Sequence, residues 1–365
     1  MLLLVERNLV RAGVRLLGKR FIALESAPTA RNGEREGFME KNEDYDRLRS
    51  ETDKSLRVAI IGLPNVGKST LINRLINRPI CATANRVHLT RAKADAVYSS
   101  DDTQLVFIDT PGLVTAHEFK KFHLDESFKS DAAEAMASAD IVGVVQDASN
   151  KYTRGMIHDR ILELMKMTRV GATSLLIMNK IDLMKRKKEL LSLVRALSSE
   201  KGWPNFSDVF MVSSLTNDGI NDLRNYLLDS AKNRDWEYPR HVVTNQPPER
   251  IIECAVRAKL MDSLPQEIPY QLKINMEHMN ICDDGSVSAF VIVACESRRI
   301  SRMVMGLRGE RVRLVARECE EELSSAFRAS VRLKISIEFK GQDTRDRCPS
   351  DYPLSTNRRS PRAPR

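Results

Sequence analysis

The chain has 365 residues, of which 42% are hydrophobic and 29% charged, an ordinary balance for a folded protein of two or three domains. Its formal net charge of +9 favours a polyanionic partner without distinguishing nucleic acid from an anionic membrane. The six cysteines form no CxxC pair and no cluster with histidine, which argues against a zinc site and a disulfide framework. No apolar run approaches the length that spans a bilayer.

The first 54 residues differ in composition from the rest. In residues 1–30, basic side chains interrupt an apolar stretch that contains only two acidic residues, Glu6 and Glu25. This pattern is typical of a mitochondrial transit peptide, and a surface helix is the alternative. Residues 31–54 contain almost no apolar side chains and are predicted to form a disordered linker.

The first folded element is predicted at Val58–Ile61, an apolar strand buried on both faces. The next segment, Gly62–Ser69, fits the phosphate-loop pattern GxxxxGK[ST], and a helical pattern follows it. Glycines let the loop backbone curl around phosphates at the positive end of the helix. Lys68 would neutralise the β- and γ-phosphates, and the Ser69 hydroxyl would ligate Mg²⁺.

A second strand, Leu105–Ile108, runs directly into a DxxG sequence that begins at Asp109. This carboxylate can hold Mg²⁺ through water, and the N–H of Gly112 can meet a γ-phosphate. The polar segment Ile80–Ala94 lies between the two loops, as a switch segment would, and its Thr90 is the candidate second Mg²⁺ ligand.

The base is predicted from the loops after two later strands. The strand Ser174–Met178 ends in the NKxD sequence Asn179–Asp182. A carboxylate such as Asp182 accepts hydrogen bonds from the N1–H and the amine of guanine, which adenine cannot offer. The strand Val209–Val212 leads into Ser213–Leu215, which is placed to contact the base again.

These loops follow buried strands in a fixed order, with a further strand at Ile141–Gln146, which predicts a doubly wound α/β domain from Leu56 to about Ala231. The sequences GLPNVGKSTLIN, DTPGL, NKID and SSL resemble the Era family of ribosome-associated GTPases. The resemblance continues to about residue 340, through the linker sequences EYP and QPPER and the stretch Leu264–Tyr270. Leu89 and Ser214 depart from the family pattern, in which threonine and alanine are usual.

The resemblance implies a Mg²⁺-dependent GTPase that binds GTP and GDP. The implied nucleotide-binding residues are Gly62, Asn65, Val66, Gly67, Lys68, Ser69, Thr70, Asp109, Gly112, Asn179, Lys180, Asp182, Ser213, Ser214 and Leu215. The implied metal ligands are Ser69, Thr90 and Asp109.

Lys68, Thr90 and Asn65 are the predicted catalytic residues. Leu113 stands after the DxxG sequence, where many GTPases have a glutamine that orients water, so we expect slow intrinsic hydrolysis. The chain resembles GTPases that place K⁺ near the phosphates, with Asn65 as its candidate ligand.

The C-terminal region shows helical and strand periodicity in the order of a type II KH domain, an α+β fold. The expected elements are a helix at Arg250–Leu264, strands at Gln271–Glu277 and Ser286–Cys295, a helix at Arg299–Met305, a longer helix to about Ala329, and a strand at Val331–Phe339. The sequence Gly306–Gly309 (GLRG) separates the last two helices. Such a GxxG turn lets the backbone approach single-stranded RNA.

Basic residues are concentrated around this turn. Residues 241–340 hold 15 basic and 14 acidic side chains, so the region as a whole is almost neutral. The candidate RNA-binding residues are Gly306, Leu307, Arg308, Gly309, Arg298, Arg299, Arg302, Arg311 and Arg313. A basic patch suits phosphate binding, and a helix-breaking turn with a solvated arginine face is the alternative.

The predicted organisation is a transit peptide (1–30), a disordered linker (31–54), a GTP-binding domain (55–232), an interdomain linker (233–248), a type II KH domain (249–340) and a disordered basic tail (341–365). The resemblance implies a mitochondrial matrix protein that binds small-subunit ribosomal RNA near its 3′ end and assists small-subunit assembly, with peripheral association with the inner mitochondrial membrane as a further candidate. The alternatives are a GTPase that acts in tRNA modification and a GTP-regulated adaptor at an anionic membrane surface.

Overall fold

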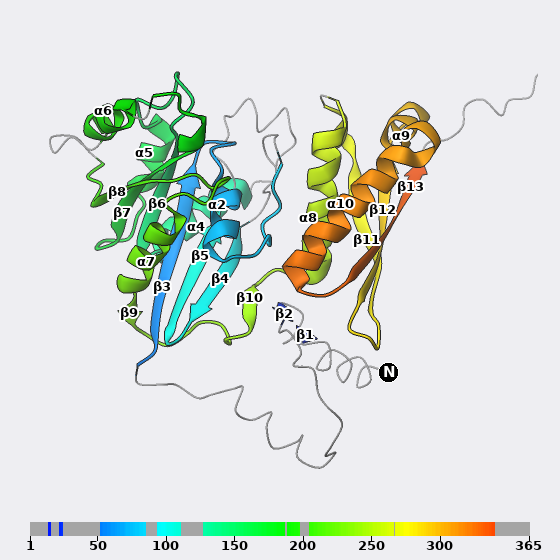
Figure 1. The fold of residues 1–365 in the computed structure, drawn as a ribbon, viewed down its shortest axis with the longest axis horizontal. Coiled ribbons are helices and arrows are strands. Elements are labelled where there is room, and N and C mark those ends of the chain that lie inside the picture. Colours follow the sequence, from blue (N-terminus) through cyan, green and yellow to red (C-terminus); the bar gives the residue numbers. More distant parts are fainter. Residues whose placement is uncertain are drawn as a thin grey trace, which may run out of the picture.

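The computed structural model describes residues 14–15, 22–24, 52–84, 93–110, 127–186, 188–197, 204–265 and 267–339. Figure 1 shows two folded bodies, an α/β domain on the left and a smaller α+β domain on the right. The predicted transit peptide apart from two short strands, most of the predicted disordered linker, and the predicted basic tail lie outside the described residues.

The first domain is built on a central sheet. Its six strands are β3 (Lys54–Gly62), β4 (Ala94–Ser100), β5 (Thr103–Asp109), β6 (Ile141–Asp147), β7 (Thr173–Asn179) and β8 (Asp208–Met211). They lie in the order β4-β5-β3-β6-β7-β8, and all neighbours are parallel except β4, which is antiparallel to β5. The carboxyl ends of the parallel strands therefore meet at one edge of the sheet, where ligands bind in such folds.

Helices cover both faces of this sheet. On one face lie α2 (Lys68–Leu75) and α7 (Ile220–Asp229), and on the other α4 (Ser127–Ser138), α5 (Asp159–Met165) and α6 (Lys188–Leu197). Alternate residues of β3 point to the two faces, so that Val58 and Ile60 pack with the α2 side while Ala59 and Ile61 pack with α4 and α5. The predicted doubly wound α/β domain is confirmed.

Short antiparallel strands extend the sheet beyond the prediction. These are β1 (Val14–Arg15), β2 (Ile22–Leu24), β9 (Lys232–Asn233) and β10 (Val242–Thr244). Strand β9 pairs with β3, and β10 pairs with β4 at Thr244 and Ala96, while β2 pairs with β10 and β1 with β2. The interdomain linker predicted for residues 233–248 is therefore partly a strand of the first domain's sheet.

The second domain has the predicted element order. It comprises α8 (Pro248–Ser263), the 3-10 helix η4 (Ile268–Gln271), β11 (Lys273–Ile281), β12 (Val287–Cys295), α9 (Arg298–Met305), the 3-10 turn η5 (Leu307–Gly309), α10 (Glu310–Phe327) and β13 (Val331–Phe339). Strand β12 is central, antiparallel to β11 and parallel to β13. Helices α8 and α10 pack on one face of this sheet (Figure 1). The α+β arrangement expected of a type II KH domain is confirmed.

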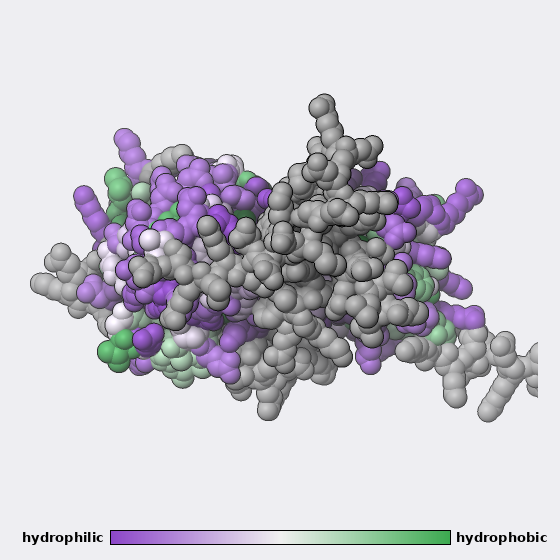
Figure 2. All heavy atoms as spheres, turned by 90° about the horizontal axis from the view of Figure 1, so that it is seen from below, coloured by the Kyte–Doolittle hydropathy of each residue, from purple (hydrophilic) through white to green (hydrophobic). Residues whose placement is uncertain are grey.

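The two domains touch next to the predicted switch segment. Ala82 and Ala84, which precede the undescribed residues 85–92, pack against Ala258 and Met261 of α8. No helix in the described parts of the chain is long and apolar enough to cross a membrane. On the face shown in Figure 2, hydrophilic side chains dominate the described surface, and hydrophobic ones form small separate groups.

Candidate functional site

The phosphate loop, Gly62–Ser69, joins the carboxyl end of β3 to the start of α2. Its two glycines are required by close packing as well as by backbone angle. A Cβ atom on Gly62 would lie 2.5 Å from the carbonyl oxygen of Val145, and one on Gly67, at φ 96°, would lie 2.5 Å from Nδ2 of Asn179. Only glycine fits at either position, as the phosphate-loop pattern requires.

Lys68 is held inside the loop, with only 7% of its surface exposed. Its Nζ donates hydrogen bonds to the carbonyl oxygens of Gly62 (3.2 Å) and Leu63 (3.1 Å). Burial lowers the pKa of Lys68 to about 8, and the nearby Asp109 opposes this shift. A buried ammonium group favours an anionic ligand, because phosphate charge would offset its desolvation.

Asp109 ends β5 beside the loop and is 2% exposed. Its Oδ2 accepts a hydrogen bond from the Ser69 hydroxyl (2.9 Å), and the Cys81 thiol also donates to its carboxylate. Burial raises the pKa of Asp109, while Lys68, Ser69 and Cys81 act in the opposite direction. The carboxylate is thus held by two hydrogen bonds beside the charge of Lys68.

Two oxygen groups at this point fit a magnesium ion. Oδ1 of Asp109 is buried and has no hydrogen-bond partner among the described residues, and the Ser69 hydroxyl lies beside it. Mg²⁺ prefers hard oxygen ligands of this kind and keeps several waters. The other predicted ligand, Thr90, and the predicted phosphate contact, Gly112, lie outside the described residues.

Asn179 links the phosphate loop to the loop after β8. Its Nδ2 donates to the carbonyl oxygen of Val66 (2.9 Å), and its Oδ1 accepts from both the N–H and the hydroxyl of Ser214 (3.0 Å each). The second of these bonds exists because serine replaces the usual alanine. Thr70 follows the phosphate loop in the first turn of α2.

The remaining NKxD residues also reach these two loops. Oδ1 of Asp182 accepts a short hydrogen bond from the Ser213 hydroxyl (2.6 Å), which orients the carboxylate. Nζ of Lys180 donates to the carbonyl oxygen of Asn65 and to Oδ2 of Asp147 (2.8 Å). Burial alone would raise the pKa of Asp147, but hydrogen bonds from Lys180 and Ser149 lower it, so this carboxylate is ionised beside the lysine.

The GLRG turn lies between α9 and α10 in the second domain. Gly306 and Gly309 have φ of 71° and 77°, and Arg308 has φ of 51°. A Cβ atom on Gly306 would lie 2.9 Å from Cβ of Arg311. Leu307 at the tip is 80% exposed. The turn therefore presents its backbone and two side chains to the surface, and its first glycine is required sterically.

Two of the predicted RNA-binding arginines support the turn itself. Arg311 donates to the carbonyl oxygen of Met303, and Arg313 donates to that of Arg308 (2.9 Å). The exposed arginines around the turn are Arg298, Arg299, Arg302, Arg308, Arg313 and Arg317. The structure thus brings the predicted basic patch together on the surface.

Comparisons with known proteins give matches that cover most of the chain. The model of a protein family described as a 50S ribosome-binding GTPase matches residues 57–180. The mitochondrial GTPase Era of Danio rerio is 31% identical over 342 residues, covering 80% of this chain and 76% of the fish protein. The chain belongs to the Era family of GTPases. The GTPase Era of Mesorhizobium japonicum is 32% identical over 284 residues, covering 78% of this chain and 87% of that protein.

The fold of a solved Era structure extends over both domains. The crystal structure of Era in complex with MgGDPNP and nucleotides 1506–1542 of 16S ribosomal RNA aligns with a TM-score of 0.68 at 21% identity, covering 79% of this chain and 94% of that chain. The Era fold of this chain is therefore established over the GTPase domain and the domain that carries the GLRG turn.

The sequence did not reveal several residues that shape this Era-family site. Cys81 contacts Asp109, and both the N–H and the carbonyl oxygen of Cys81 are bound by the side chain of Asn73 (2.8 and 2.7 Å). Arg74 binds carbonyl oxygens of the Ser213–Leu215 loop. No spacing rule links these residues, because they meet only through tertiary packing. No disulfide joins the five cysteines in the described ranges.

Proposed function

We propose that this Era-family GTPase is a GTP-controlled RNA-binding factor that assists assembly of the small ribosomal subunit in mitochondria. The main support is the GLRG turn, whose backbone and exposed Leu307 and Arg308 are surrounded by arginines on a domain with the KH element order. Further support comes from relatives: the Danio rerio protein is named mitochondrial, and the aligned Era structure contains nucleotides 1506–1542 of 16S ribosomal RNA. The proposed RNA is therefore single-stranded and near the 3′ end of small-subunit ribosomal RNA.

In the proposed GTP site, each group already fixed by the fold has one task. Lys68 neutralises phosphate charge inside the loop, and Asp182, oriented by Ser213, accepts hydrogen bonds from guanine. Ser69 and Asp109, with Thr90 from the switch segment, would hold Mg²⁺. When bound, the ion neutralises charge on the β- and γ-phosphates.

We also assign K⁺ to this site, with Asn65 as a ligand. Asn65 has a φ of 60°, and its carbonyl oxygen is held by Lys180, so its backbone is fixed at the mouth of the phosphate loop. A monovalent cation there would supply positive charge where no arginine finger is inferred. GTP turnover should be faster in KCl than in NaCl at equal ionic strength, and equal rates in the two salts exclude the assignment.

The RNA half of the proposal is tested at the turn. The double variant Leu307→Asp/Arg308→Asp places two negative charges where phosphates would lie, while both glycines and the core stay unchanged. Single-stranded RNA with the 3′-terminal small-subunit sequence should bind at least tenfold more weakly at physiological salt, since a phosphate contact is replaced by repulsion. GTP hydrolysis without RNA should be unchanged.

A matched control is available on α6. Leu191 and Arg195 are exposed there, and Leu191→Asp/Arg195→Asp makes the same charge change far from the turn. If the α6 variant loses RNA binding as strongly as the GLRG variant, or neither loses it, the turn is not the RNA site.

The two alternative functions predict different ligands. An adaptor at an anionic membrane would bind cardiolipin-containing vesicles through the same arginines and prefer them to RNA. A GTPase of tRNA modification would not need the GLRG turn. Mitochondrial ribosomes are assembled in the matrix, so a protein that binds their RNA would act in that compartment. The same vesicle assay tests peripheral contact with the matrix side of the inner membrane.

A further inference from the structure

Arg74 joins the phosphate-binding helix to the loop that follows β8. It lies in the last turn of α2, and its Nε donates to the carbonyl oxygen of Ser214 (2.9 Å). One of its terminal nitrogens donates to the carbonyl oxygen of Leu215 (3.2 Å). Hydrogen bonds from a guanidinium group are stronger than those between neutral groups, and its planar fork fixes two acceptors at once.

These two bonds determine which way the loop's N–H groups point. In a trans peptide the C=O and the following N–H point in opposite directions. Turning the Ser214 carbonyl toward Arg74 therefore turns the N–H of Leu215 to the other side of the loop. The next N–H, that of Thr216, does point away from Arg74, since it donates to the hydroxyl of Ser213 (3.1 Å).

The side away from Arg74 is the side that reads the base. The Ser213 hydroxyl, which accepts from Thr216 there, itself donates to Asp182 (2.6 Å). Ser214 is tied to Asn179 on the same side. The N–H of Leu215, turned to this side, suits a carbonyl acceptor, and guanine carries one at position 6.

Arg74 is itself held in place by the helix after the loop. Arg224 of α7 donates to the carbonyl oxygens of Leu75 (2.8 Å) and Arg74 (2.7 Å), and its guanidinium lies 5.3 Å from the ring centre of Tyr98. Both ends of the loop are thereby fastened to the end of α2. The loop cannot shift without breaking charge-assisted hydrogen bonds.

We propose that Arg74 is a positioning residue for guanine recognition: by binding the carbonyl oxygens of Ser214 and Leu215 it presents the loop's N–H to the 6-oxo group of the base. This inference rests on the proposed GTP site. It adds a specificity-determining residue that touches no ligand and lies outside every sequence motif of the chain.

The test compares GDP with 6-thioguanosine 5′-diphosphate, which keeps the N1–H and the exocyclic amine of guanine but replaces the 6-oxo group by sulfur, a weak hydrogen-bond acceptor. Both dissociation constants are measured on the full chain by titration calorimetry. The parent should prefer GDP, and Arg74→Ala should weaken GDP by about tenfold, the value of one hydrogen bond, while changing the analogue by less than about twofold. Arg74→Lys, which keeps the charge but reaches one carbonyl, should give an intermediate preference.

Arg195→Ala on the exposed face of α6 is the matched control and should change neither constant. Equal weakening of both nucleotides by Arg74→Ala would show a merely structural role and overturn the proposal, as would an unchanged preference for GDP. A parent that does not distinguish the two nucleotides would instead overturn the assignment of Ser213–Leu215 to guanine. Thermal melting of the nucleotide-free variant separates unfolding from a loss of recognition.

Discussion

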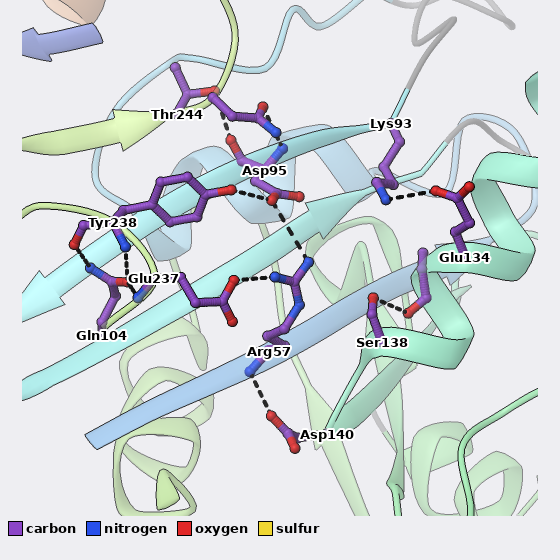
Figure 3. Close-up of polar contacts among 12 residues, drawn as sticks. Arg57, Lys93, Asp95, Gln104, Glu134, Ser138, Asp140, Glu237, Tyr238 and Thr244 are labelled. Carbon is purple, nitrogen blue, oxygen red and sulfur yellow. Dashed lines mark hydrogen bonds and ion pairs between the residues drawn. The ribbon is translucent and has the colours of Figure 1, made fainter. Parts of the chain in front are cut away.

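Tyr238 fastens the interdomain linker to the GTPase domain, and its hydroxyl can be removed without disturbing the backbone (Figure 3). The hydroxyl donates to Oδ2 of Asp95 (2.6 Å), a residue that is only 4% exposed. The backbone of Tyr238 is held separately by the side chain of Gln104, through bonds of 3.0 and 2.8 Å. Tyr238→Phe therefore deletes the hydrogen bond from its hydroxyl to a buried carboxylate.

The structure gives the expected size of this loss. After the change, Oδ2 of Asp95 keeps only a 3.8 Å ion pair with Arg57, and Oδ1 already has no hydrogen-bond partner in the described ranges. A hydrogen bond to a charged group contributes about 1.5–3 kcal/mol, so we expect a loss of about 2 kcal/mol in the free energy of unfolding. For a domain of this size that lowers the melting temperature by about 4–8 °C.

Trp236 offers a local probe for the assay, because it lies two residues before Tyr238 and its Nε1 donates to the carbonyl oxygen of Asp102 (3.0 Å). Replacing Trp203, the only other tryptophan, by phenylalanine leaves its fluorescence as the sole tryptophan signal during urea unfolding. Tyr226→Phe is the matched control, since Tyr226 donates to Asp208 at an exposed site (2.7 Å). An exposed bond should contribute well under about 1 kcal/mol.

Alkaline pH provides a second readout of the same bond. Burial and Asp95 together raise the pKa of Tyr238 above its usual value of 10, because both disfavour a phenolate. The folded-state pKa then exceeds the unfolded one, so the stabilisation is complete below pH 10 and is lost as pH rises further. The difference between parent and Tyr238→Phe should stay constant from pH 7 to about 9. A difference below about 0.5 kcal/mol in that range would refute the reasoning.

Three further predictions concern the nucleotide site and the buried carboxylate of Asp140. Asp182→Asn should weaken GTP and admit XTP, measured by competition, because the new amide donates where the carboxylate only accepted. Lys68→Ala and Ser69→Ala should each lower GTP turnover at least tenfold with an unchanged circular dichroism spectrum. Burial would raise the pKa of Asp140, but hydrogen bonds from Arg234 and a backbone N–H lower it. The stabilisation from this carboxylate is therefore lost only as pH falls below about 4. Arg234→Met removes one of these hydrogen bonds and should move acid unfolding to higher pH.

The loops that touch nucleotide could be predicted because their chemistry restricts residue type locally. Gly62 and Gly67 are dictated by close packing around them, and Asp109 and Asp182 by the magnesium ion and the guanine base that they would bind. The second domain could be predicted equally well, because a strand with one buried face alternates apolar and polar residues, as Val331–Phe339 does. In both cases the signal lies within a few consecutive residues.

Features that depend on distant partners were missed. Strand β4 reads ADAVYSS, which is too short of large apolar side chains to stand out, and it forms because β5 and β10 flank it. Asp95 on this strand is 143 residues from its partner Tyr238. From the sequence alone, Arg74 is a basic residue near the end of a helix, and a favourable interaction with the helix dipole is enough to explain it. Pairings of this kind carry no local pattern.

Two of the contacts between distant segments lie at the ends of the predicted switch segment. Near the start of the predicted switch segment, Ile80–Ala94, Ala82 packs against α8 of the second domain. Just after its end, the N–H of Asp95 donates to Asn245 (3.0 Å) and its carbonyl oxygen accepts from Thr244 (2.7 Å), three and four residues before the start of α8. The segment that carries Thr90 is therefore attached at one end to α8 and at the other to the strand and turn that lead into α8. We infer that a change in that segment would reach α8 through these contacts.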